Sequence, residues 1–162
     1  MYLRLKDRTK EHVLTFWNKT KDEEIRGLFP FTVESLEKAL ILFEESMEAD
    51  ALSYGNVIYF EDKYIGDIWC YGVDESDEKM AMLSIVIFEK QFWGKGIGTE
   101  AVKIFITEMF KRFNIERIGA FTYRHNHGSI GMLNNAGFQK RDTFFEDEIE
   151  SMYFEISYKN LL

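Results

Sequence analysis

The sequence predicts a mixed α/β fold, with about seven strands in a mostly antiparallel sheet and about four helices. Three observations predict this class. The middle of the chain is rich in β-branched and aromatic residues, a strong amphipathic helix follows a glycine-rich turn, and strand and helix patterns alternate afterwards. The chain has 162 residues, of which 46% are hydrophobic, so it can bury a substantial core. No repeat, low-complexity stretch or linker interrupts the pattern, and we expect one domain over residues 1–162.

The first third of the chain predicts one strand and two helices. Residues 2–6 alternate apolar and charged side chains, which is typical of a strand. Residues 9–18 carry apolar side chains at helical spacing. After the single proline, Pro30, residues 36–47 repeat apolar side chains at steps of four, three and four, which predicts an amphipathic helix.

The middle of the chain predicts three antiparallel strands, because short polar segments separate residues 56–61, 64–73 and 79–88. Residues 99–113 carry the clearest apolar helical stripe. The pattern returns to a strand afterwards, and such a strand–helix–strand unit should cross over with right-handed chirality between roughly parallel strands. The remaining predicted elements are a strand over 117–123, a helix over 129–136 capped by Gly137, and a hairpin of strands over 138–145 and 150–158.

Composition excludes several function classes. The formal net charge is −8, which argues against a nucleic-acid partner held by a basic surface. Acidic clusters favour a solvated surface, or secondarily a cationic partner such as an amine. The lone Cys70 excludes an intrachain disulfide and a cysteine metal cluster, and we expect it to be packed in a strand. No apolar run approaches the roughly 20 residues that span a bilayer, so we expect a cytoplasmic protein with no membrane partner.

Three alternating glycines precede the strongest helix. Gly94, Gly96 and Gly98 tolerate positive φ, and together with the helix N-terminus they can turn several backbone N–H groups towards one anion. Lys95 adds a positive charge. The segment therefore predicts a binding site for a diphosphate.

Two other phosphate motifs fit this segment poorly. A Walker loop requires Gly-Lys-Ser/Thr, which is absent. A dinucleotide fingerprint should follow its strand at once and have an acidic residue about 20 residues later, whereas here the glycines start late and the next strand ends without an acid. A glycine-rich turn without any ligand stays open as an alternative.

At this point the chain resembles the GNAT N-acetyltransferase superfamily. The family's acetyl-CoA motif falls on residues 93–98, with Trp93 where Gln or Arg is usual. Residues 126–138, which read Asn-x-x-Ser, a helix and Gly-Phe, resemble the branch of ribosomal-protein N-terminal acetyltransferases. Residues 2–4 and 16–18 resemble its opening strand and helix, so the resemblance covers almost the whole chain.

The resemblance implies a strongly twisted sheet that splays in the middle and holds the thioester arm of acetyl-CoA in the gap. Backbone of the strand before the glycines would pair with the pantetheine amides, the glycine turn would hold the diphosphate, and Asn126 would contact the arm from the opposite side. The residues implied in cofactor binding are Val86, Ile87, Phe88, Trp93, Gly94, Lys95, Gly96, Ile97, Gly98, Thr99 and Asn126.

The resemblance also implies catalytic roles. Many members place a tyrosine acid where this chain has Leu133, and in the related branch a serine takes that role, which maps to Ser129. Ser129 is equally a candidate N-cap for the last helix. The branch's candidate base maps to Glu148, flanked by Glu146 and Glu150, and a chain of waters is the alternative base.

Other side chains have weaker claims to a role. Trp69 and Tyr71 are candidates to line an acceptor pocket. His125 and His127 lack a nearby acidic residue and make a poor metal site, so we expect no metal; His127 is a minor catalytic candidate.

The predicted function is acetyl transfer from acetyl-CoA to a primary amine, by direct attack of the amine on the thioester. The acceptor classes left open are a protein N-terminus, a polyamine and another small amine, and we also allow for a homodimer. The alternative is a non-catalytic acyl-CoA-binding or sensor module, favoured by the missing tyrosine.

Overall fold

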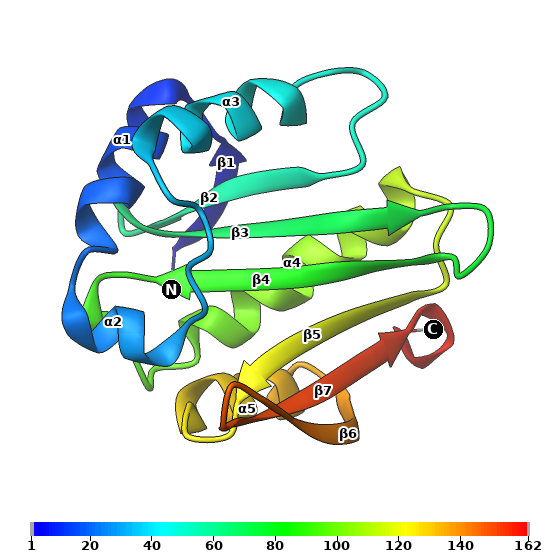
Figure 1. The fold of residues 1–162 in the computed structure, drawn as a ribbon. Helices are drawn as coiled ribbons and strands as arrows, with labels where there is room; N and C mark the ends of the chain where they lie inside the picture. Colours follow the sequence, from blue (N-terminus) through cyan, green and yellow to red (C-terminus); the bar gives the residue numbers. More distant parts are fainter. Residues whose placement is uncertain (1, 162) are drawn as a thin grey trace.

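The structure is a computed structural model that describes residues 2–161. Strands and helices alternate along the chain much as the sequence predicts (Figure 1). The elements are β1 (Leu3–Asp7), α1 (Lys10–Lys19), α2 (Glu23–Leu28), α3 (Leu36–Ser46), β2 (Tyr54–Phe60), β3 (Lys63–Asp74), β4 (Met80–Ile87), a 3-10 helix (Lys90–Phe92), α4 (Ile97–Arg112), β5 (Arg117–Tyr123), α5 (His127–Asn135), β6 (Gln139–Glu146), β7 (Ile149–Ser157) and a second 3-10 helix (Tyr158–Leu161).

The predicted mixed α/β class and the mostly antiparallel sheet of seven strands are confirmed. The sequence analysis missed α2, which brings the α-helices among residues 2–161 to five. This helix has six residues and a single buried apolar side chain, Ile25, so it carries no readable period. Its start is stabilised by Asp22, whose side chain accepts a hydrogen bond from the backbone N–H of Ile25 at 3.1 Å.

The last helix also begins earlier than predicted. Helix α5 starts at His127, and its N-cap is Asn126, whose Oδ1 accepts the backbone N–H of Ser129 at 3.1 Å. The interpretation of Ser129 as the N-cap was therefore wrong, because the asparagine three residues earlier supplies the oxygen. Ser129 lies within the first turn of α5, and its hydroxyl is not needed to cap the helix.

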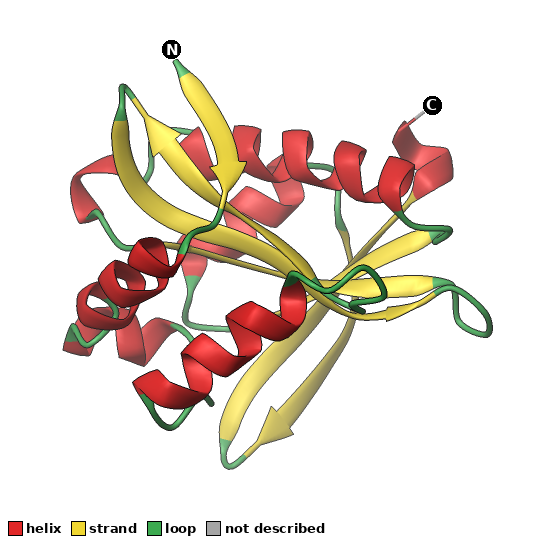
Figure 2. Cartoon of the chain, turned by 90° about the horizontal axis from the view of Figure 1, so that it is seen from above, coloured by secondary structure: helices red, strands yellow, loops and turns green. Residues whose placement is uncertain are grey.

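The sheet opens between β4 and β5. Strand order is β1-β2-β3-β4-β5-β7-β6, and β4–β5 is the parallel pair. These two strands pair only over Met80–Met82 and Arg117–Gly119, at one end. Beyond Met82 they diverge, as the strongly twisted sheet in Figures 1 and 2 shows. The predicted splay is thus present, and one edge of β4 has no neighbouring strand beyond that point.

Helices cover the two faces of the sheet unequally. Helix α4 packs on the central strands, and its fully buried Phe105, Ile106 and Met109 form the main core with side chains of β3, β4 and β5. Burial of each such side chain contributes about 2 kcal/mol. A smaller aromatic cluster on the other face joins Phe16 of α1 to Phe88 and Trp69. None of the helices within residues 2–161 combines the length and the apolar character needed to cross a bilayer.

A buried carboxylate lies between β3 and the first loop. Asp67 is 3% exposed, pairs with Arg8 Nε at 3.1 Å and accepts a hydrogen bond from the hydroxyl of Tyr64. Burial raises the pKa of Asp67 to about 6, and this effect outweighs the attraction to Arg8 and the hydrogen bond from Tyr64. The native state therefore binds a proton at Asp67 more tightly than the unfolded chain, whose reference pKa is 3.8.

We expect Asp67→Asn to change how stability depends on pH. The raised pKa favours the wild-type fold below pH 4, and this contribution is lost as the pH rises to 6. The difference in unfolding free energy between wild type and variant (wild type minus variant) should therefore fall by about 2 kcal/mol as the pH rises from 4 to 7. Urea unfolding at each pH measures it. Asp62→Asn, at an exposed turn, is the control. The prediction would be contradicted if the difference in unfolding free energy from wild type were as independent of pH for Asp67→Asn as for Asp62→Asn.

Candidate active site

The glycine turn before α4 presents a set of free backbone donors. Gly94 and Gly96 have φ values of +72° and +80°, and Gly96 is the N-cap of α4 without any side-chain cap. Among residues 2–161, no protein acceptor takes a hydrogen bond from the backbone N–H groups of residues 94–99. Donors at a helix N-terminus that are left unpaired in this way suit an anion.

The three glycines serve different purposes. A Cβ at Gly94 or Gly96 would meet nothing within 4 Å, so these positions require glycine for their backbone conformation. A Cβ at Gly98 would lie 2.8 Å from Sδ of Met132, on α5. Gly98 therefore allows α4 and α5 to approach closely beside the turn.

Trp93, the departure from the usual motif, attaches the turn to the sheet. Its Nε1 donates to the backbone oxygen of Ile87 at 2.8 Å, and its ring packs in the small aromatic cluster. The indole thus holds the turn against the open end of β4. Lys95 is exposed beside the turn, and it makes no ion pair within the described part of the chain.

The backbone direction along β4 decides which groups face the opening. The N–H of Phe88 donates to Ile65 on β3 at 2.9 Å, and hydrogen-bonding direction alternates along a strand. Val86 and Phe88 therefore direct their backbone groups to β3. Of the three predicted residues, Ile87 directs its groups to the open side, where Ile85 does the same.

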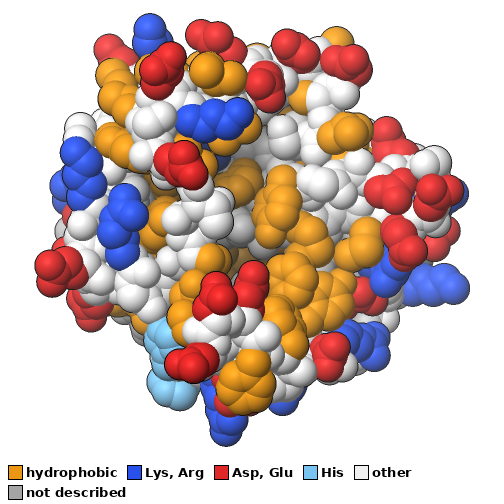
Figure 3. Space-filling view, viewed as in Figure 1, with side chains coloured by type: hydrophobic (Ala, Val, Ile, Leu, Met, Phe, Trp, Pro, Cys, Tyr) orange, Lys and Arg blue, Asp and Glu red, His pale blue; other side chains and the backbone are white. Residues whose placement is uncertain are grey.

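A cavity of about 970 Å³ occupies the splay between β4 and β5. Figure 3 shows hydrophobic side chains around a hollow at the centre of this face. Met132 lines the cavity and its Sδ also lies beside Gly98, so this residue of α5 connects the cavity with the glycine turn. Trp69 and Tyr71, the candidates for an acceptor pocket, both line the cavity. Further lining residues include Trp17, Arg26, Phe31, Ser84, Phe121, Tyr123, Ser129, Phe144 and Glu146.

The predicted Asn126 and Ser129 lie together at the start of α5. Asn126 is 5% exposed, and its Nδ2 donates to the backbone oxygen of Leu28 at 3.3 Å while its Oδ1 caps the helix. Asn126 therefore ties α5 to the segment after α2. Ser129 is half-buried and lines the cavity, and its hydroxyl makes no hydrogen bond within residues 2–161.

The predicted base, Glu148, lies outside the large cavity. It occupies the two-residue turn between β6 and β7, with a φ of +67°, and borders a separate cavity of about 460 Å³ beside His125 and His127. Its neighbour Glu146, the last residue of β6, lines the large cavity instead. The two carboxylates are only two residues apart at a hairpin turn, and sequence spacing alone could not resolve which of them lines the large cavity.

Tyr123 lies at the same end of the large cavity as Glu146. Burial raises the pKa of Tyr123, and the negative charge of Glu146 raises it further. Its ring stacks on His125 at 5.2 Å, and His125 Nε2 is 2.7 Å from the backbone oxygen of Gly27. Residues 2–161 contain no group of three or more His, Cys, Asp or Glu side chains arranged to hold a metal.

Two further sequence predictions concern buried side chains. Cys70 is fully buried with its Sγ 3.2 Å from Sδ of Met109, and burial raises the pKa of its thiol to about 12, so it is packed in β3 as predicted. Leu133, at the position where the resemblance leads us to expect a tyrosine, is 1% exposed.

Comparison with known proteins gives the family. A family model described as the acetyltransferase (GNAT) domain matches residues 3–139. The chain belongs to the GNAT acetyltransferase family. A curated relative, the probable N-acetyltransferase YjcK of Bacillus subtilis (strain 168), is 30% identical to this GNAT chain over 111 residues. That match covers 68% of this chain and spans 61% of the length of the relative.

Solved structures share the fold of this GNAT chain. The spermidine N-acetyltransferase from Vibrio cholerae, in complex with CoA and spermine, has a TM-score of 0.83 and 17% identity, covering 99% of this chain and 98% of its own. RimL, a ribosomal L7/L12 alpha-N-protein acetyltransferase in complex with CoA, has a TM-score of 0.80 and 13% identity, covering 96% and 93%. At these identities the likeness concerns the fold.

Proposed function

We propose that this chain is an acetyl-CoA-dependent N-acetyltransferase that acts as one domain over residues 1–162. The observation that carries the proposal is the junction at Met132, which lines the cavity between β4 and β5 and lies beside the glycine turn with its unpaired N–H groups. An anion site near a mostly apolar cavity suits a molecule with a diphosphate at one end and a thioester arm at the other.

The cofactor would lie along the open edge of β4. The diphosphate accepts hydrogen bonds from the turn, with Lys95 as a neighbouring positive charge. The amides of the pantetheine arm pair with the outward backbone groups of Ile85 and with the outward N–H of Ile87, whose oxygen already accepts Trp93 Nε1, in the manner of an added strand. Asn126, already bonded on both sides, supports the arm through the position of α5 rather than through a free polar atom.

The chemistry requires one group that accepts a proton and one that returns it. The amine nitrogen attacks the thioester carbonyl carbon, and the proton it loses passes to the carboxylate of Glu146, directly or through water. The C–S bond then breaks, and the departing sulfur takes a proton by way of Ser129, whose hydroxyl donates one proton to the sulfur and receives one from the protonated Glu146 through water. We assign the base to Glu146 rather than to Glu148 because Glu146 lines the cavity.

An amine acceptor is supported by the relatives. The curated relative is named a probable N-acetyltransferase, and the Vibrio cholerae neighbour was solved with spermine. The alternative, a non-catalytic acyl-CoA sensor, is favoured by Leu133 in place of a tyrosine. Calorimetry with acetyl-CoA, beside free-thiol release over a panel of primary amines, separates the two. Binding without thiol release from any amine would favour the sensor, and no binding would refute both.

We expect Ser129→Ala to lower kcat by about 100-fold, because the thiolate loses its proton donor. The affinity for acetyl-CoA should stay within about twofold, since the variant removes one oxygen that makes no internal hydrogen bond. Thiol-release kinetics and calorimetry measure the two effects. Ser84→Ala, at another serine lining the cavity, is the matched control. Unchanged kcat in the Ser129 variant would remove Ser129 from the mechanism.

A further inference from the structure

We infer that the acceptor of this site is a small primary amine with an aromatic or branched apolar substituent. Its single positive charge is that of the amine nitrogen itself. The inference rests on the proposed function and concerns the substrate class that the cavity selects. It follows from three features of the cavity: the aromatic side chains in its walls, the balance of charge among its lining residues, and the location of an acidic loop elsewhere.

One wall of the cavity is an aromatic cluster packed in advance. Phe16 and Trp69 meet edge to face with ring centroids 6.0 Å apart, and Phe31 and Phe29 pack against the same cluster. These rings pack against the buried Val86 and Ile25, so this wall is already packed without a ligand. Such a surface receives an apolar group at little conformational cost.

The opposite wall is aromatic too, and it is left uncovered. Phe121 on β5 lines the cavity although its side chain is 52% exposed, and it contacts Phe144 on β6 edge to face at 5.4 Å. Tyr71 on β3 lines the cavity at 39% exposure. Large aromatic side chains that stay exposed around a hollow are poorly solvated, and an apolar ligand would cover them.

Charge in the cavity is sparse and balanced. Among its lining residues, Glu146 and Arg26 are the charged side chains, one of each sign. Arg26 lies over the ring of Phe31 at 5.3 Å, so a positive charge already occupies that side. One ammonium group can pair with Glu146, and the aromatic faces can attract it further. A polyamine or aminoglycoside would bring several charges with no further carboxylate to meet them.

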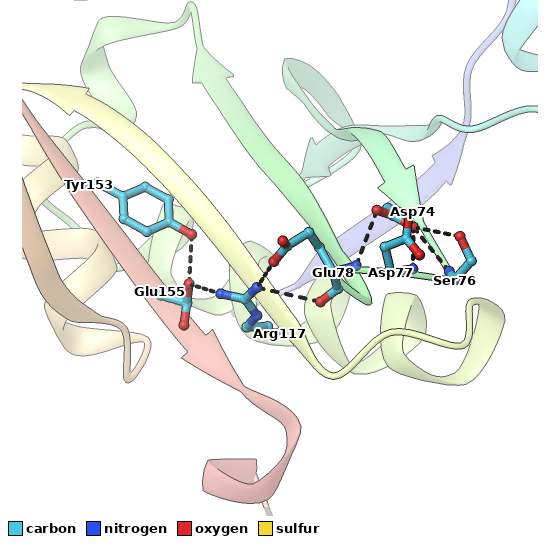
Figure 4. A network of polar contacts seen from close by, with 7 residues as sticks. All are labelled: Asp74, Ser76, Asp77, Glu78, Arg117, Tyr153 and Glu155. Atoms are coloured by element: carbon cyan, nitrogen blue, oxygen red, sulfur yellow. Dashed lines mark hydrogen bonds and ion pairs between the residues drawn. The ribbon is translucent and has the colours of Figure 1, made fainter.

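The acidic loop between β3 and β4 does not add carboxylates to the cavity. In the loop between β3 and β4, the side chain of Asp74 accepts backbone N–H groups of Ser76, Asp77 and Glu78. Glu78 and Glu155 both pair with Arg117, as Figure 4 shows. These acids stabilise the loop between β3 and β4 and the end of the sheet around Arg117. The acidity of the whole chain is therefore no guide to a multiply charged acceptor.

The cavity also distinguishes a small amine from a peptide. A peptide N-terminus brings several backbone amides that need polar partners. Most of the lining side chains are aliphatic or aromatic, and the hydroxyl of Thr20 is already bonded to the backbone oxygen of Phe16 at 2.7 Å. A volume of about 970 Å³ accommodates a thioester arm and one small amine.

The first experiment compares probe amines on the wild-type chain with acetyl-CoA saturating. The probes are 2-phenylethylamine and tryptamine, propylamine as the small apolar reference, spermidine and kanamycin as multiply charged amines, and a short peptide with a free N-terminus. We expect kcat/KM for 2-phenylethylamine to exceed the values for propylamine, spermidine and kanamycin by at least about tenfold. A higher value for spermidine or kanamycin, or for the peptide, would overturn the inference.

A second measurement keeps the inference testable if the proposed function fails. Trp17 and Trp69 line the cavity, so their fluorescence reports amine binding without any turnover. We expect 2-phenylethylamine to bind at least about tenfold more tightly than spermidine, with or without CoA present. The reverse order would refute the substrate class, whereas absent thiol release with this order retained would refute only the transferase activity.

Two adjacent phenylalanines provide matched variants. Phe144 lines the cavity, and Phe145 next to it is 71% exposed and does not. Phe144→Ala should raise KM for 2-phenylethylamine by about tenfold and leave KM for propylamine and for acetyl-CoA unchanged. Phe145→Ala should change none of them. Equal KM values for 2-phenylethylamine in the two variants would contradict the assignment of this wall.

Discussion

Gly96→Glu should abolish acetyl-CoA binding, with an affinity loss of at least about 100-fold, or about 3 kcal/mol. A Cβ at Gly96 would meet nothing within 4 Å, so a glutamate has room there, in the middle of the turn with the free N–H groups of residues 94–99. A glutamate there excludes the diphosphate and repels it. Isothermal calorimetry with acetyl-CoA and with CoA measures the loss.

The control for this variant must carry the same backbone strain and the same new charge. Gly72 in β3 fits, because its φ is +60° and its Cβ position is also free within 4 Å. Gly72→Glu should lose a similar amount of stability, about 1–2 kcal/mol, and keep its affinity for acetyl-CoA. If Gly96→Glu binds acetyl-CoA as tightly as Gly72→Glu does, the diphosphate site lies elsewhere.

Glu146→Gln should lower kcat by about 100-fold or more, because a neutral amide cannot accept the proton of the attacking amine. The substitution keeps the size of the side chain at the end of β6. Thiol release measured from pH 6 to pH 9.5 checks it. As the pH approaches the pKa of the acceptor amine, about 10, more of the amine is already unprotonated and needs the base less. The ratio of wild-type kcat to variant kcat should therefore become smaller at high pH.

Glu148→Gln is the matched control for the base. Glu148 is two residues away, exposed in the turn and beside the smaller cavity. We expect its kcat to stay within about twofold of wild type. A large loss in Glu148→Gln, with little change in Glu146→Gln, would return the base to Glu148 and show that the hairpin turn adopts another arrangement during the reaction.

The elements with a long, regular apolar period were predictable. Helix α4 carries its stripe over sixteen residues, and its buried side chains are those that the period selects. Helix α2 could not be predicted, because its six residues with one buried side chain are too few to show a helical repeat of apolar residues. The start of α5 depended on which of two nearby polar side chains capped it. Asn126 and Ser129 are both good caps, so local sequence could not decide between them.

The candidate site also has one part that could be predicted from the sequence and one part that could not. The glycine turn is a local feature, since the glycines, the helix start and Trp93 lie within six consecutive residues, and the turn could therefore be predicted from the sequence. The cavity walls come from α1, the segment after α2, β3, β5 and β6. No sequence signal marked Phe121, Phe144 or Arg26 as neighbours, because each belongs to an ordinary apolar or charged pattern of its own element.

The sequence by itself determined the fold class, the family and the position of the glycine turn, because these depend on periods and spacings within short stretches of chain. Only the tertiary structure decided which carboxylate enters the cavity, which backbone groups of β4 stay free and which side chains form the acceptor walls. The physical reason is that a two-residue turn and the divergence of β4 from β5 set the direction of side chains that lie far apart in the sequence.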